Sequence, residues 1–183
     1  MKKLKIPPLF LFFILIFSSC VKQLDFSQIE DFSAKPIFES SLVHLTADQI
    51  DFFDLVNSVE IPQTLYLTDF TILNSKFVRD NLIRAEFNIE FNNHFDRQFT
   101  INVIFLDQND LETYRFNPII IGNKNQSFSQ KEIINISGNT AFLSSTKVWV
   151  SVELLPSSNG SVLDPNIEQK LEFKSSGIFY LEI

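Results

Sequence analysis

Residues 82–92 carry the clearest alternation of apolar and polar side chains in the chain. Ile83, Ala85, Phe87, Ile89 and Phe91 alternate there with Arg84, Glu86, Asn88, Glu90 and Asn92. Because successive side chains of a β-strand point to opposite faces, this spacing predicts a strand with one dry face and one solvated face. The same period recurs in 99–105 and in 147–154, so both of these segments are predicted strands as well.

Shorter apolar runs, separated by polar turn residues, extend this pattern along the chain. Further strands are expected at 36–45, 67–78, 111–116, 119–121 and 128–136. At the C-terminal end, 167–174 and 178–183 predict a hairpin, because Ser175-Ser176-Gly177 between them is typical of a tight turn.

One segment has the period of a helix instead. Its apolar residues recur every three positions, beginning at Ile50. Thr46 has the chemistry of a helix N-cap, and Gln49 stands three residues later, where its side chain can bond back to the cap. We therefore expect one short amphipathic helix over 47–57.

About seven to ten short strands, each with one apolar face, must bury those faces against a second layer. The sequence predicts an all-β fold, a two-layer antiparallel immunoglobulin-like β-sandwich with one short helix. The name describes architecture only, because a chain with a single cysteine lacks the Cys…Trp…Cys signature of true immunoglobulin domains. A closed barrel is the alternative architecture.

The first twenty residues follow a different pattern, that of a secretory signal. Three lysines precede an uninterrupted apolar run over 9–17, and two serines followed by Cys20 close the segment. This order is typical of a cleaved signal peptide, and the run is too short to span a bilayer. Cys20 is the only cysteine of the chain. Its position resembles the lipobox of bacterial lipoproteins, whose cysteine is lipidated and becomes the first mature residue.

This resemblance implies a lipoprotein signal peptide (1–19), an acidic flexible tether (20–35) and a single β-sandwich domain (36–183). It also implies attachment to a membrane through a lipid on Cys20. The composition, rich in Phe, Ile and Asn, resembles that of small lipoproteins of Bacteroidota and places the anchor in the outer membrane. An acidic signal for display on the cell exterior is absent directly after Cys20, so we expect the domain to face the periplasm.

The net charge of the chain after cleavage at Cys20 bears on which partners it can bind. Three of the 15 Lys and Arg residues precede Cys20, which leaves 12 against 22 acidic residues and a net charge of −10 after cleavage. Such a charge disfavours nucleic acid and anionic membrane surfaces as partners. The lipid, and not electrostatic attraction, would then hold the protein at the bilayer.

The polar residues match no known catalytic or metal-binding pattern. His94 and Asp96 have no second histidine nearby, and 107–110 lacks the glycine that a calcium loop requires at its sixth position. Glu86 and Glu90 share a strand face, but their Cα atoms are about 13 Å apart in a regular strand, too far for a glycosidase pair. The sequence therefore predicts no cofactor and no metal, and it disfavours an enzyme.

Trp149 is the side chain that points most clearly to binding. Within 147–154 it stands on the polar side of the predicted strand with Lys147 and Ser151. An exposed indole at this place can anchor a protein partner or stack on a sugar ring. The candidate binding residues are therefore Trp149, Lys147 and Ser151.

Ile104 and Leu106 fall on the corresponding side of their own strand. Apolar residues there indicate that part of the outer face is covered, and we expect the helix over 47–57 to be the cover. Two functions follow. The first is a non-catalytic envelope lipoprotein that binds an envelope protein as an interaction or assembly subunit. The alternative is a carbohydrate-binding lipoprotein in nutrient capture, and an enzyme comes third.

Overall fold

Eleven strands form most of the part of the chain that the computed structural model describes, which is residues 34–124 and 126–183. In chain order they are β1 (Ile37–Asp48), β2 (Phe53–Asp54), β3 (Val59–Glu60), β4 (Gln63–Asp69), β5 (Leu82–Asn93), β6 (Phe99–Leu106), β7 (Glu112–Arg115), β8 (Ile119–Ile121), β9 (Gln126–Asn135), β10 (Lys147–Leu154) and β11 (Lys170–Leu181). The signal peptide, Cys20 and most of the predicted tether lie outside the described residues.

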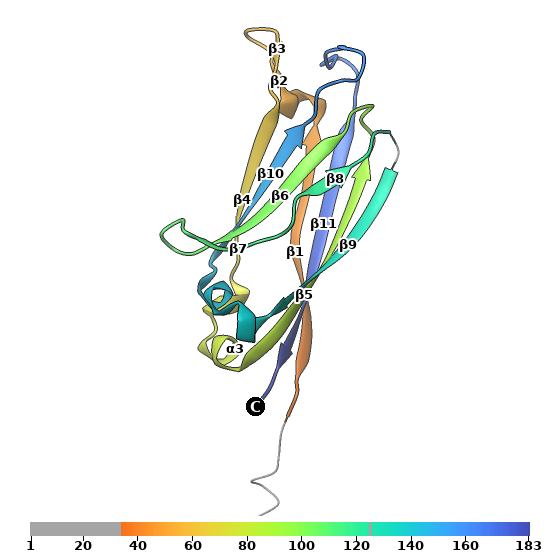
Figure 1. Cartoon of the computed structure of the whole chain (residues 1–183). Coiled ribbons are helices and arrows are strands. Elements are labelled where there is room, and N and C mark those ends of the chain that lie inside the picture. Colours follow the sequence, from red (N-terminus) through yellow and green to blue (C-terminus); the bar gives the residue numbers. More distant parts are fainter. Residues whose placement is uncertain (1–33, 125) are drawn as a thin grey trace, which may run out of the picture. The chain divides into compact units, whose positions relative to one another are not determined.

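Two antiparallel sheets pack face to face, as Figure 1 shows. The four-stranded sheet has the order β1-β11-β5-β9, and the five-stranded sheet has the order β4-β10-β6-β7, with β8 pairing with β6. A small hairpin of β2 and β3 extends from one end. The predicted all-β, two-layer antiparallel sandwich is therefore confirmed, and the described residues contain one short α-helix. No helix among the described residues is long and apolar enough to cross a membrane.

Phenylalanine rings fill the space between the sheets. The ring of Phe87 on β5 lies 5.3 Å from that of Phe105 on β6 and 6.0 Å from that of Phe179 on β11. Such tilted and edge-on pairs add about 0.5–1.5 kcal/mol each beyond the burial of their area. Ala85, Phe87, Ile89 and Phe91 of β5 are all buried, so the alternation in 82–92 marks the core face of β5.

The predicted helix over 47–57 is wrong. β1 runs to Asp48, a single 3-10 turn follows at η1 (Gln49–Phe52), and the chain then enters the β2–β3 hairpin. The apolar residues of this segment do not share a buried face, because Phe52 is fully buried while Ile50 and Val56 are exposed. The spacing of three was therefore not the mark of an amphipathic helix.

The only α-helix among the described residues, α3 (Lys76–Asn81), lies where the sequence pattern predicted the end of a strand over 67–78. The hydroxyl of Ser75 caps it by accepting a bond from the Val78 amide. Arg79 then donates to the carbonyl oxygens of Leu73 and Asn74 in the 3-10 turn before it, η2 (Ile72–Asn74). These local bonds hold the 3-10 turn and the start of the helix together.

The predicted C-terminal hairpin is also wrong, because β11 passes through Ser175-Ser176-Gly177 as one strand. It pairs with β1 on one side and β5 on the other. A Cβ atom on Gly177 would lie 2.7 Å from a ring carbon of Phe179 and 3.0 Å from a methyl group of Leu42. The missing side chain of Gly177 leaves room for the Phe179 ring, and the residue does not form a turn.

Candidate functional site

Trp149 lies on the outer face of the five-stranded sheet. Its neighbours along β10, Val148 and Val150, belong to the buried core, so the side chain of Trp149 is directed to the opposite face. The register places Leu67 of β4 on one side of it and Ile104 of β6 on the other. Trp149 is partly exposed, whereas Ile104 between Trp149 and Arg115 of β7 is buried.

Two leucines extend this apolar area to the border of the sheet. Leu65 and Leu67 alternate along β4 and are 52% and 61% exposed. The predicted covering helix does not exist, so both side chains face solvent. We call Leu65, Leu67, Ile104 and Trp149 the outer strip. The sequence pattern did not single out the two leucines, although their spacing of two places both on one face of this strand, opposite Tyr66.

The polar residues predicted to flank Trp149 are already engaged within the molecule. The Lys147 ammonium donates to the Asp110 carboxylate over 2.6 Å, and the Ser151 hydroxyl accepts a bond of 2.6 Å from the Gln63 amide. Ser151 is also buried. The structure therefore places Trp149, Lys147 and Ser151 on one face, but it leaves the indole among apolar neighbours and not in an open polar site.

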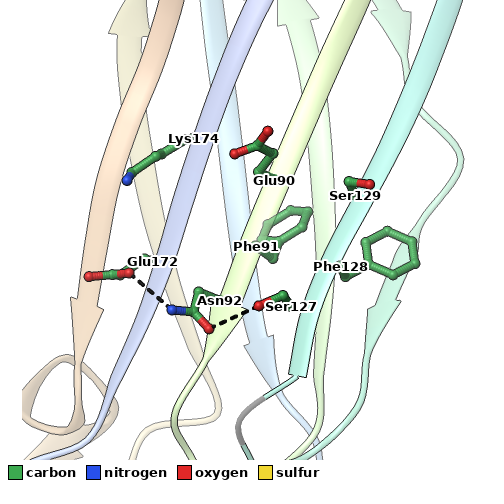
Figure 2. A pocket seen from close by; sticks show the side chains of 8 residues that line it. All are labelled: Glu90, Phe91, Asn92, Ser127, Phe128, Ser129, Glu172 and Lys174. Carbon is green, nitrogen blue, oxygen red and sulfur yellow. Dashed lines mark hydrogen bonds between the residues drawn. The ribbon is translucent and has the colours of Figure 1, made fainter.

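A polar hollow of about 340 Å³ lies on the other outer face of the sandwich, that of the four-stranded sheet (Figure 2). Its lining residues are Glu90, Phe91, Asn92, Ser127, Phe128, Ser129, Glu172 and Lys174. The Asn92 amide donates to Glu172 over 3.3 Å and accepts a bond of 3.5 Å from Ser127. The ring of Phe91 itself packs in the buried core. The polar hollow and the partly exposed Trp149 therefore lie on opposite faces of the molecule.

Glu86, expected on a solvated face, is almost fully buried. Its carboxylate accepts a bond of 2.8 Å from Lys131 and a second bond from Arg84, whose guanidinium lies 5.0 Å from the ring centre of Tyr180. The Lys131 bond holds the pKa of Glu86 below its usual value, although burial opposes this shift. Glu86 is thus an ion-paired structural residue, separate from Glu90 in the hollow.

The loop at His94 is held by a buried amide. The Asn93 side chain donates to the carbonyl oxygens of Arg97 and Gly122 and accepts a bond from the Phe95 amide. His94 itself lies 3.0 Å from the Asn92 amide nitrogen through Nε2. No group of three or more His, Cys, Asp or Glu residues suited to a metal ion occurs in the part of the chain described by the structure.

Comparisons with known proteins give no family: no family model matches the chain, and no curated protein matches it. Among solved structures, it is similar to a Parabacteroides distasonis protein described as secreted, with 14% identity, a TM-score of 0.48, and coverage of 64% of this chain and 38% of that one. It is also similar to the VP2 subviral particle of infectious bursal disease virus, with 6% identity, a TM-score of 0.45, and coverage of 80% and 33%. A third similarity is to endospore appendage pili of Bacillus, with 11% identity, a TM-score of 0.35, and coverage of 81% and 91%. The chain spans 38% and 33% of the length of the first two.

Proposed function

We propose that this chain is a non-catalytic envelope lipoprotein that binds a protein partner through the outer strip. The observation that carries the proposal is the exposure of Leu65 and Leu67 beside Trp149 on an open sheet face. Exposed apolar patches on soluble domains mark interaction sites, and tryptophan is enriched among the residues that dominate binding energy. The engaged flanking groups Lys147 and Ser151 favour apolar contact over polar recognition.

The signal pattern and Cys20 support a location at the outer membrane, with the domain facing the periplasm. The 14 residue-to-residue steps from Cys20 to Ala34 reach at most about 50 Å when fully extended. A domain held within that distance of the bilayer meets partners that are themselves at or near the membrane. The lipid would supply the attachment, since the net charge of −10 gives no attraction to anionic headgroups.

Co-purification tests this proposal. The full chain carries an affinity tag in its native host, and membranes are solubilised in a mild detergent. Wild type is compared with the double variant Leu67→Ser/Trp149→Ser and with Leu111→Ser, whose side chain is 63% exposed in the loop between β6 and β7, outside the outer strip. We expect one companion protein at near-equal amount with wild type and Leu111→Ser, and a loss of at least about tenfold with the double variant. Identical companions in all three samples would refute the proposed surface.

Carbohydrate binding is the second candidate, because a partly exposed indole on an open face can stack on a sugar ring. Sugars also need hydrogen-bonding groups next to the ring, and Lys147 and Ser151 are already bonded to Asp110 and Gln63. Trp149 is the only tryptophan, so its fluorescence reports directly on this site. A saturable change with one glycan of a panel would favour this function, and an unchanged spectrum with every glycan would exclude it.

A further inference from the structure

β4 forms one border of the five-stranded sheet, and β10 is its only partner strand among the described residues (Figure 1). The carbonyl of Pro62 accepts a bond from β10, and the amide of Phe70 donates to Thr146 just before β10. In an antiparallel strand, the N–H and C=O groups of one residue both point toward the same neighbouring strand, and those of the next residue both point to the other side. Even-numbered residues of β4 therefore face β10, and the N–H and C=O groups of Gln63, Leu65, Leu67 and Asp69 point to the free edge.

This edge lacks the features that normally prevent sheet edges from pairing. Natural sheets protect edges with bulges, charges, proline or short strands. β1 has an irregularity between Ser41 and Val43, β9 carries Lys131 and Glu132, and β7 is only four residues long. β4 instead keeps an unbroken register with β10 over Gln63–Asp69, and it holds no proline and no charge before its last residue.

The sequence of β4 is also self-complementary. Residues 64–68 read Thr-Leu-Tyr-Leu-Thr, which is the same in both directions about Tyr66. When two copies of such a strand run antiparallel with Tyr66 opposite Tyr66, Leu65 of each copy lies opposite Leu67 of the other. In this register the outward backbone groups of Leu65 and Leu67 form hydrogen-bonded pairs, and Tyr66 occupies the non-hydrogen-bonded position.

We propose that two copies of this chain form a two-fold symmetric dimer by antiparallel pairing of their β4 strands, which joins the two five-stranded sheets. Leucine pairs then form on the outer face, and threonine pairs form at 64 and 68. Asp69 falls opposite Gln63 and not opposite another Asp69, so the like charges of the copies do not meet in the ladder. On the joined outer face, Leu67 lies between Trp149 of its own chain and Leu65 of the second copy. The dimer requires neither the lipid nor a partner protein.

Cysteine cross-linking tests the register. The full chain is purified in detergent with Cys20→Ser, so that each introduced thiol is the only one. In the dimer, positions 65 and 67 lie opposite with Cα atoms about 5.5 Å apart, within disulfide range, whereas position 65 lies more than about 7 Å from its own equivalent. Mixed Leu65→Cys and Leu67→Cys chains should oxidise to a dimer at least about tenfold faster than either variant alone. Equal rates for the mixture and the single variants would overturn the pairing.

Sedimentation of the Cys20→Ser chain measures the same association without a covalent bond. Leu67→Lys introduces a charge at the edge, and we expect its dimer dissociation constant to rise at least about tenfold over wild type. Leu111→Lys, with a similarly exposed side chain, should leave it unchanged, and equal melting temperatures of the two variants show that both are folded. A monomeric wild type at every concentration would overturn the proposal. So would β4 amides that become protected from hydrogen exchange only when a membrane extract is added, because this result would assign the edge to another protein.

Discussion

Arg97 joins three loops at the end of the sandwich that carries the β2–β3 hairpin. Its guanidinium is 7% exposed and donates to both oxygens of Glu60, at 2.9 and 3.2 Å. It also donates to the carbonyl oxygens of Leu155 and Ser161, while Glu60 accepts a further bond from the Leu163 amide. Burial raises the pKa of Glu60, but the bonds from Arg97 and Leu163 outweigh it and hold this pKa below its usual value.

Replacing Arg97 by Met keeps much of the side-chain volume and removes every bond that its guanidinium donates. Loss of one member of a buried ion pair costs about 3–5 kcal/mol, because the other charge stays buried without a partner. Glu60 is 22% exposed, so water partly compensates and we expect the lower end, about 3 kcal/mol. In a domain of this size each kcal/mol lowers the melting temperature by roughly 2–4 °C, which gives roughly 6–12 °C.

Arg115→Met is the matched control, since Arg115 forms the same two-pronged pair with Glu112 on the exposed surface. Exposed pairs contribute about 0–1 kcal/mol, so this variant should melt within about 4 °C of wild type. Urea unfolding of wild type and both variants, followed by circular dichroism, measures the three free energies. Equal losses in Arg97→Met and Arg115→Met would refute the reasoning that burial decides the strength of the Arg97 pair.

Two further predictions concern the four-stranded sheet. Gly177→Ala should lower the free energy of unfolding by about 1–3 kcal/mol, because the new methyl group overlaps the Phe179 ring, whereas Gly138→Ala has open space and should change it little; similar denaturant midpoints for both variants would contradict this. Glu86 has a lowered folded-state pKa, so its contribution is complete above its usual value of 4.5 and is lost as pH falls through the folded pKa. Below pH 4.5 the melting temperature of Glu86→Gln should therefore fall less steeply with decreasing pH than that of wild type. The same fall in both proteins would count against the ion-pair assignment.

The sequence pattern predicts best those strands that have one apolar face and one polar face. β10 alternates between core and outer residues over its whole length, so parity alone places Trp149 on the outer face. β5 alternates only from Ala85 onward, because the register with β11 is irregular before it; Leu82 is buried there, and Ile83, predicted on the dry face, is 43% exposed. The segment over 47–57 misleads because a spacing of three predicts a helix only when the residues share a buried side, and Ile50 and Val56 are exposed. Gly177 misleads because a glycine that admits a ring looks the same in sequence as one that forms a turn.

The candidate site depended on features that sequence order does not contain. Leu65 and Leu67 stand out only once the topology makes β4 a border strand. The engagement of Lys147 by Asp110 and of Ser151 by Gln63 joins residues 37 and 88 positions apart, which no local pattern reveals. Because these long-range hydrogen bonds engage the polar groups next to Trp149, the face around it has an apolar character.

Site-specific photo-cross-linking tests the proposed protein-binding face most directly. A benzoylphenylalanine at position 149 of the full chain, in the living host, keeps an aromatic ring in the outer strip. The same residue at position 90 places the probe in the hollow on the opposite outer face. The proposed function predicts an adduct with one envelope protein, distinct from this chain, at position 149 and not at position 90. Absence of any adduct at 149, or the same adducts at both positions, would contradict it.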